Sequence, residues 1–289
     1  MISAMKYTFF GFDFEFDPVA FTIPGTDWGV YWYGILITLG FVLAVLYGMS
    51  KAKKFGIDSD RLLDCILVTA PLAIAGARAY YIIFDESLTF SDFLNIHDGG
   101  LAIYGGVIVA VVVGVIMCKL RKVNILSALD LTALGFLIGQ SIGRWGNFIN
   151  QEAYGFTTGS TWFGISGEKI IEDMNTQMPV HPCFLYESIW CAIGFVVLHF
   201  LSKKRKFTGQ IAVSYLIWYG FGRFFIEYFR TDSLLVGNTS IKVSMLLSGL
   251  MVAVGLVLLV IGLKKAKSNV VLKYDSVFET EEKRAEEKE

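Results

Sequence analysis

Charged residues are scarce in this sequence of 289 residues. They make up 18% of it, hydrophobic residues make up 54%, and the mean hydropathy is +0.56. A soluble domain is about one quarter charged, so the scarcity excludes an ordinary soluble fold. The net charge of −1 supplies no basic excess for a nucleic-acid partner, and we expect none.

Patterns that bind metals or form disulfides are also missing. The four cysteines lie in apolar stretches without a C-x-x-C pair, and we expect them to pack as small hydrophobic residues: Cys65, Cys118, Cys183 and Cys191. None of the three histidines, His97, His181 and His199, forms a pair with metal-site spacing. We therefore expect no metal site and no cofactor. The first 29 residues lack a basic segment before an apolar core, so we expect no cleavable signal peptide.

What the chain has in abundance is apolar runs of about 20 residues, the length that crosses the hydrocarbon core of a bilayer. There are seven: Val30–Met49, Leu62–Phe84, Leu101–Cys118, Ala128–Ile149, Cys183–Leu201, Gln210–Phe229 and Val243–Leu263. We predict an all-α polytopic membrane protein with seven transmembrane helices. These helices belong to one domain, residues 1–268, followed by a charged and solvated cytoplasmic tail, residues 269–289.

Lysine and arginine alternate between the connections of these runs, and an excess of them marks the cytoplasmic side. The connections after the first, third, fifth and seventh runs hold fourteen: Lys51, Lys53, Lys54, Arg61, Lys119, Arg121, Lys122, Lys203, Lys204, Arg205, Lys206, Lys264, Lys265 and Lys267. The other connections and the N-terminus hold four: Lys6, Lys169, Arg230 and Lys242. This pattern places the N-terminus outside and the C-terminus in the cytoplasm. The long outer connection, residues 151–182, is expected to form a small extracytoplasmic cap with a hairpin near Ser160–Ile165.

Three arginines fall inside apolar runs, where each costs roughly 2.5–3.5 kcal/mol on insertion scales: Arg78, Arg144 and Arg223. The predicted direction of each run places all three in the outer half of the membrane. Ten further polar residues are predicted at the same depth: Tyr33, Tyr104, Asn147, Asn150, Glu152, His181, Glu187, Tyr219, Glu227 and Arg230. Tyr219, Arg223, Glu227 and Arg230 also share one helical stripe, because their spacings are close to whole turns.

This polar cluster indicates a functional cavity. Snorkelling to the headgroups explains one arginine near a helix end, but it explains poorly three arginines together with glutamates and asparagines. An anion with an apolar body suits such a cavity, and a phospholipid is one, because guanidinium groups bind phosphate with paired N–H donors. If the phosphate leaves, the same groups stabilise its developing charge. The alternative is an anion or lipid transporter, although transporters usually place polar residues at the midplane and have two related halves.

Glycines spaced four apart, Gly135, Gly139 and Gly143, lead up to Arg144. Small residues at this spacing are typical of close helix packing in membranes. We therefore predict that the fourth run packs tightly against a neighbouring helix.

The segment Gly143–Gly155, with the sequence GRWGNFINQEAYG, resembles the signature of the bacterial prolipoprotein diacylglyceryl transferase family. The family pattern G-R-x-G-N-F-x-N-x-E-x-x-G is met at every fixed position. The resemblance covers nearly the whole chain and includes residues 16–19, 31–34, 99–101, 181–187 and 219–230. It implies seven helices with the N-terminus outside, a bacterial cell membrane, and an active site that faces the outer side.

The resemblance also implies a reaction. Members transfer the diacylglyceryl group of phosphatidylglycerol to the thiol of the lipobox cysteine in a prolipoprotein, the first step of lipoprotein maturation. A thioether forms and glycerol phosphate leaves, without metal or cofactor. From motif position and predicted depth together, we assign catalytic roles to Arg144, Arg223, Tyr104, Glu152 and Glu227. We assign substrate binding to Tyr33, Arg78, Asn147, Asn150, Gly155, His181, Glu187, Tyr219 and Arg230.

Two positions depart from the family pattern. Tyr104 stands where many members have a histidine that is proposed to take the thiol proton, and tyrosine, with an ordinary pKa near 10, is a poor base at neutral pH. Three readings stay open: Tyr104 positions substrate, no base is needed, or His97 or a glutamate supplies it. Phe184 stands where members commonly have glutamine, so a hydrogen bond is expected to be absent there.

Overall fold

The computed structural model describes residues 4–26, 28–85, 88–94, 100–231, 233–235, 239 and 242–267. His97, Gly99 and the predicted tail 269–289 lie outside the described residues. The chain forms two compact units, and each is described by itself. Of the described residues, the first unit comprises those within 4–47 and 132–267, and the second comprises those within 48–131.

Each of the seven apolar runs is a helix, and the observed ends lie within four residues of the predicted ones. The helices are α1 (Trp32–Lys51), α2 (Ser59–Phe84), α3 (Ile103–Leu120), α4 (Ile125–Ile149), α6 (Cys183–Ser202), α7 (Gln210–Phe229) and α8 (Val243–Lys267). A short helix, α5 (Glu168–Met174), and two 3-10 turns, η1 (Ala52–Phe55) and η2 (Phe90–Leu94), complete the helical elements of the described residues.

Six of these helices are long and apolar enough to cross a membrane: α1, α2, α3, α4, α6 and α8. The protein is therefore a mostly helical, multi-pass membrane protein. At 20 residues α7 has the necessary length, but it carries Gln210, Arg223 and Glu227 and is not among the six. Large apolar side chains on the helices are widely exposed, for instance Leu46, Phe136 and Val257, as expected for surfaces that face lipid.

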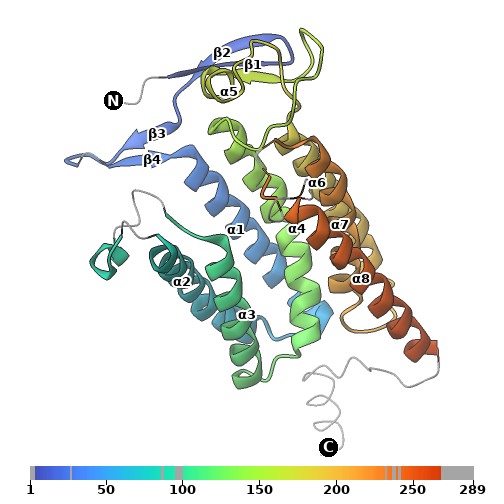
Figure 1. The fold of residues 1–289 in the computed structure, drawn as a ribbon. Coiled ribbons are helices and arrows are strands. Elements are labelled where there is room, and N and C mark those ends of the chain that lie inside the picture. Colours follow the sequence, from blue (N-terminus) through green and yellow to red (C-terminus); the bar gives the residue numbers. More distant parts are fainter. Residues whose placement is uncertain are drawn as a thin grey trace, which may run out of the picture. The chain divides into compact units, whose positions relative to one another are not determined.

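In the first unit α4, α6, α7 and α8 lie side by side (Figure 1). The predicted close packing of the glycine series is confirmed, because α4 meets α1 through small residues. A Cβ atom on Gly40 of α1 would lie 3.2 Å from both Cα and O of Gly139, and one on Gly135 would lie 3.5 Å from the Cβ of Ala44. Backbones approach closely where such residues face each other.

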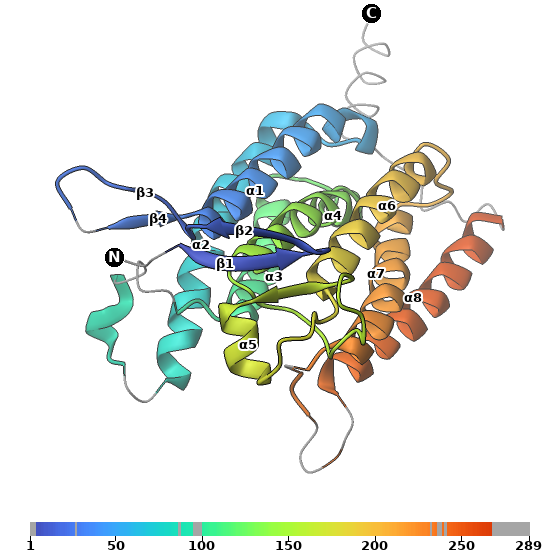
Figure 2. The same ribbon diagram turned by 90° about the horizontal axis from the view of Figure 1, so that it is seen from above.

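Among the described residues five short strands accompany the helices: β1 (Met5–Phe9), β2 (Phe12–Phe16), β3 (Val19–Thr22), β4 (Gly29–Tyr31) and β5 (Ile165–Gly167). Strands β2, β1 and β5 form one antiparallel sheet in that order, and β3 pairs with β4. The sheet lies across the end of α4 (Figure 2), where the Tyr7 hydroxyl donates a hydrogen bond of 2.5 Å to the carbonyl oxygen of Ile149.

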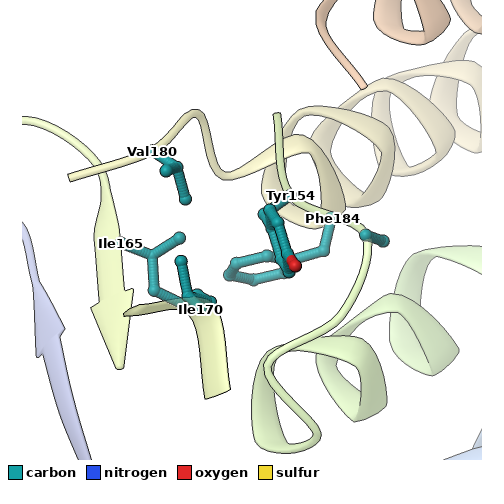
Figure 3. Close-up of a cluster of buried hydrophobic side chains, with 6 residues drawn as sticks. Tyr154, Ile165, Ile170, Val180 and Phe184 are labelled. Carbon is teal, nitrogen blue, oxygen red and sulfur yellow. The ribbon is translucent and has the colours of Figure 1, made fainter. Parts of the chain in front are cut away.

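The chain is mostly helical, and these strands add a small sheet to the helices. Within the long loop Ile165 pairs with Val180, and β5 also pairs with β1 from the N-terminal segment, which the sequence did not predict. We call β1, β2, β5 and α5 the cap. It encloses a small apolar core, in which Tyr154, Ile165, Ile170, Val180 and Phe184 converge (Figure 3).

The second unit is a pair of packed helices, α2 and α3. Asp58 caps α2, because its carboxylate accepts hydrogen bonds from the backbone N–H groups of Asp60 and Arg61. Cys65 and Cys118 are both buried, as are Cys183 and Cys191 of the first unit, in agreement with the prediction that the cysteines pack as small hydrophobic residues.

Candidate functional site

The polar residues of α4, α6 and α7 meet around one carboxylate, that of Glu187 on α6, which is 2% exposed. Arg144 of α4 donates from Nη2 to its Oε1 at 2.6 Å. Arg223 of α7 donates from Nη1 to its Oε2 at 2.7 Å, and the Tyr219 hydroxyl donates to Oε1 at 3.0 Å. The three helices α4, α6 and α7 are thus joined at a single side chain.

The predicted stripe on α7 is confirmed for Tyr219, Arg223 and Glu227. The carboxylate of Glu227 is 1% exposed, and its Oε2 forms an ion pair of 2.7 Å with Nη2 of Arg223, one turn earlier. Arg230 lies just beyond the last turn, because α7 ends at Phe229 and Arg230 has extended backbone angles. The two terminal guanidinium nitrogens of Arg223 are therefore paired with different carboxylates.

Exposure differs between the two signs of charge in this cluster. The Glu187 side chain is 3% exposed, whereas those of Arg144 and Arg223 are 22% and 15% exposed. The carboxylate is closed off, whereas the two arginine side chains keep a modest exposed surface. An anion that entered the site would meet arginine donors whose orientation is already fixed, which is the arrangement that stabilises developing negative charge.

A second line of contacts leads from Arg144 to the cap. Nη1 of Arg144 donates to Oδ1 of Asn147 at 3.2 Å, and Nδ2 of Asn147 donates to Oε2 of Glu152 at 3.4 Å. The other oxygen of Glu152 pairs with Nζ of Lys169 in α5 at 3.4 Å. The signature residues Arg144, Asn147 and Glu152 are thus consecutive members of one hydrogen-bonded chain.

Glu152 sits in a strained turn. Its neighbours Gln151 and Ala153 have φ angles of 53° and 56°, a left-handed conformation that costs a non-glycine residue about 1–3 kcal/mol. The turn is held by Gln151, which is 1% exposed, accepts from the backbone N–H of Lys169 at 2.9 Å and donates to the carbonyl oxygen of Lys6 at 3.2 Å. The cap therefore fixes the backbone that presents Glu152.

Gly155, His181 and Arg230 form a neighbouring group. The N–H of Gly155 donates to the carbonyl oxygen of His181 at 2.8 Å, and Gly155 forms a bridge with Arg230. A Cβ atom on Gly155 would lie 2.6 Å from the carbonyl oxygen of Phe229, so only glycine fits. Nδ1 of His181 lies 3.0 Å from the Tyr186 hydroxyl, and burial lowers the pKa of His181. A neutral imidazole is favoured there.

Three other positions in the first unit have structural contacts. The Tyr33 ring packs on Gly146, where any side chain would collide with it. The carbonyl oxygen of Asn150 accepts a hydrogen bond of 3.4 Å from Nζ of Lys169. Phe184, which departs from the family pattern, is 1% exposed and packs against Phe148 at a centroid distance of 5.2 Å, so apolar packing takes the place of a polar contact.

Arg78 and Tyr104 belong to the second unit. Arg78 is 3% exposed, donates from Nη1 to the carbonyl oxygen of Gly100 at 3.0 Å and lies over the ring of Tyr81 at 5.9 Å. Tyr104 lies in the first turn of α3 and is 56% exposed. Arg78 thus fixes the segment that leads into α3.

From the sequence, two lysines were expected only to be ordinary charged residues of the outer connections, but the structure gives both of them specific contacts. Lys169 reaches Glu152, as described above. Lys242 donates from Nζ to the carbonyl oxygens of Glu227 at 2.7 Å and Arg230 at 2.5 Å, which caps the end of α7. In the sequence these two lysines stand out only because few basic residues fall in the outer connections. Within the described residues, no three His, Cys, Asp or Glu side chains are grouped to hold a metal ion.

Comparison with known proteins gives one consistent result. A family model described as prolipoprotein diacylglyceryl transferase matches residues 18–261. Proteins named phosphatidylglycerol–prolipoprotein diacylglyceryl transferase are similar over most of the chain. The one from Finegoldia magna is 44% identical over 247 residues, which cover 84% of this chain and 94% of that protein.

Two further relatives with the same name show the same extent of similarity. The protein of Clostridioides difficile is 40% identical over 257 residues, which cover 88% of this chain and 98% of that protein. The protein of Listeria innocua is 38% identical over 252 residues, which cover 84% of this chain and 89% of that protein.

Proposed function

Because the chain belongs to the prolipoprotein diacylglyceryl transferase family, we propose that it transfers the diacylglyceryl group of phosphatidylglycerol to the lipobox cysteine thiol of prolipoproteins. The sequence predicted this reaction from the segment Gly143–Gly155, and the family and its named relatives confirm it. The relatives are named as transferases, and the transporter alternative gains no support. The structural observation that carries the proposal is the pair of arginines held on Glu187.

In the proposed reaction the cysteine loses its proton and the thiolate attacks the glyceryl carbon that bears the phosphate ester. A C–S bond forms, the C–O bond to phosphate breaks, and its electron pair leaves with glycerol phosphate. The leaving group gains one negative charge during this step. Arg144 and Arg223 bind the phosphate of the lipid and stabilise that added charge, since both side chains are partly exposed while the carboxylate that holds them is closed off. A cationic site also favours the thiolate over the thiol.

Glu187 and Glu227 take different roles in this proposal. Glu187 was predicted to bind substrate, but its oxygens are occupied by Arg144, Arg223 and Tyr219, so we assign it as a positioning residue. Glu227 holds the second nitrogen of Arg223 in the same way. Asn147 and Glu152 extend the chain of contacts from Arg144 toward the cap, where Glu152 is 43% exposed and accessible to the thiol.

Three readings of the thiol proton were left open by the sequence: Tyr104 only positions substrate, no base is needed, or His97 or a glutamate is the base. Among the glutamates of the cluster Glu152 is the accessible one, and its carboxylate is held by Lys169. We propose Glu152 as the group that takes the thiol proton and Tyr104 as a residue that positions substrate. Tyr33, Arg78, Asn150, Gly155, His181 and Arg230 complete the proposed substrate-binding set.

The proposed arrangement in the cell membrane has seven spans, with α7 as the seventh. The alternation of fourteen basic residues against four supports an outer N-terminus, a cytoplasmic C-terminus and a cap on the outer side. A span that carries Arg223 and Glu227 is reasonable because the two charges pair with each other and with Glu187. The site then faces the leaflet in which a secreted prolipoprotein presents its lipobox.

The test uses the purified full chain in vesicles that contain phosphatidylglycerol, with a lipobox peptide as acceptor. Wild type should release glycerol phosphate in step with thioether formation on the peptide. Arg144→Ala should lose at least about 100-fold in kcat, the usual scale for removing a charge-stabilising donor. Equal release by wild type and Arg144→Ala would contradict the proposal. A peptide with serine in place of the lipobox cysteine is the control for hydrolysis.

A further inference from the structure

The helices α6 and α7 carry the same short motif, a tryptophan followed four residues later by glycine. On α6 it is Trp190 and Gly194, and on α7 it is Trp218 and Gly222. The motif on each helix faces the motif on the other. The indole of Trp190 occupies the space that a side chain at Gly222 would fill, and the indole of Trp218 does the same at Gly194.

The two tryptophans exchange hydrogen bonds. Nε1 of Trp190 donates to the carbonyl oxygen of Trp218 at 2.9 Å, and Nε1 of Trp218 donates to the carbonyl oxygen of Trp190 at 3.1 Å. Their rings stack with centroids 4.4 Å apart and an interplanar angle of 17°. Each carbonyl lies one turn before the facing glycine, so the absence of a Cβ is what lets the indole N–H reach it.

A second reciprocal pair joins α4 to α6. Oγ of Ser141 donates to the carbonyl oxygen of Ser188 at 3.0 Å, and Oγ of Ser188 donates to the carbonyl oxygen of Ser141 at 2.7 Å. Ser188 directly follows Glu187, and Ser141 lies three residues before Arg144. Near Glu187, α6 is therefore joined to α4 by the serine pair and to α7 by the tryptophan pair.

The tryptophan pair also lies close in sequence to the residues of the polar cluster. Trp190 lies three residues after Glu187, Trp218 directly precedes Tyr219, and Gly222 directly precedes Arg223. Sliding one helix along the other by a fraction of a turn breaks both indole bonds and moves Glu187 away from Tyr219 and Arg223. We propose that the reciprocal Trp190–Trp218 pair is a positioning device of the transfer reaction, which fixes the register in which Glu187 orients Arg223 for the phosphate. This inference rests on the proposed function.

The register matters because the arginines act through orientation. A displacement of about 1 Å in a catalytic group costs up to about 100-fold in rate. Glu187 makes its contacts at 2.6–3.0 Å, and these distances leave little room for displacement. Loss of register should lower turnover more than lipid binding, since charge develops on the phosphate in the transition state.

The experiment compares four single variants of the full chain, and the double variant of Gly222→Ala and Trp190→Phe, in phosphatidylglycerol vesicles with a lipobox peptide. Gly222→Ala displaces the Trp190 indole, and Trp190→Phe keeps an aromatic ring but removes the N–H donor. The matched controls are Gly249→Ala, a helical glycine of α8 with no atom within 4 Å of an added Cβ, and Trp162→Phe, an exposed tryptophan near the cap. For each variant kcat, KM for phosphatidylglycerol and the midpoint of thermal unfolding are measured.

We expect Gly222→Ala and Trp190→Phe to lose about tenfold or more in kcat per folded molecule, with KM within about twofold of wild type. The double variant should lose no more than Trp190→Phe alone, because the smaller ring relieves the collision. Both controls should match wild type. Unchanged kcat in Trp190→Phe overturns the inference, and this variant decides the matter if Gly222→Ala does not fold. If wild type itself releases no glycerol phosphate, the proposed function fails and the inference falls with it.

Discussion

At the residue scale, Glu187 is a carboxylate whose oxygens are all engaged by neighbouring side chains. A buried charge of this kind contributes little net stability, because desolvation offsets attraction, but removing one partner leaves uncompensated charge. Together, the two negative charges of Glu187 and Glu227 match the two positive charges of Arg144 and Arg223. The arrangement therefore serves to orient the arginines rather than to stabilise the fold.

Replacing Glu187 with Gln should destabilise the protein by about 3–5 kcal/mol, because two arginines then lose their shared partner. It should also lower glycerol phosphate release by at least about 100-fold, the usual scale for loss of charge stabilisation. Thermal unfolding in detergent and the vesicle assay measure the two effects.

The matched control is Glu152→Gln, whose partner Lys169 is 42% exposed, so that the change in stability should stay below about 1 kcal/mol. Equal stability losses in the two variants would show that Glu187 is not the centre of the cluster.

Part of the site could be predicted from sequence at this scale. The spacing of Tyr219, Arg223 and Glu227 placed them on one face of α7, because a helix has a fixed period. The central position of Glu187 could not be predicted, since it depends on how three helices pack. Lys169 and Lys242 were missed for the same reason, because their partners, Glu152 and the carbonyl oxygen of Glu227, lie 17 and 15 residues away in the sequence.

At the scale of elements, the contact between α1 and α4 depends on Gly40. A side chain larger than Ala at this position would push against the backbone of Gly139. We expect Gly40→Val to destabilise the protein by about 1–3 kcal/mol, the usual cost of overpacking, measured by thermal unfolding. Gly34→Ala on the same helix has no atom within 4 Å of the added Cβ and should be neutral or slightly stabilising. A loss of stability in Gly34→Ala as large as in Gly40→Val would argue against a specific contact.

The helices were predictable because apolar runs of this length have few alternatives, and all seven were located. The N-terminal strands were not predicted, although residues 12–16 alternate phenylalanine with acidic residues in the period of a strand. What the sequence could not indicate is that β5 pairs with β1, which lies about 160 residues away. Long-range pairing leaves no local pattern.

At the scale of the whole molecule, the proposed topology predicts which surfaces a reagent outside the cell can reach. Single cysteines at Thr26 and Leu235 should react with a membrane-impermeant maleimide on intact cells, and one at Lys204 only after permeabilisation. All three native residues are exposed, and the four native cysteines are buried and give little background. Labelling of Lys204→Cys and Leu235→Cys from the same side would contradict α7 as a span.

The reciprocal tryptophan bonds between α6 and α7 have a consequence for how the protein responds to bilayer thickness. Two helices that can slide adjust separately when the hydrocarbon region becomes thicker or thinner. Helices that are joined by reciprocal hydrogen bonds cannot slide along each other without losing both bonds, so α6 and α7 respond by tilting together. Glu187, Tyr219 and Arg223 then keep their mutual distances while the pair as a whole tilts, and the chemistry is insulated from changes in the surrounding lipid.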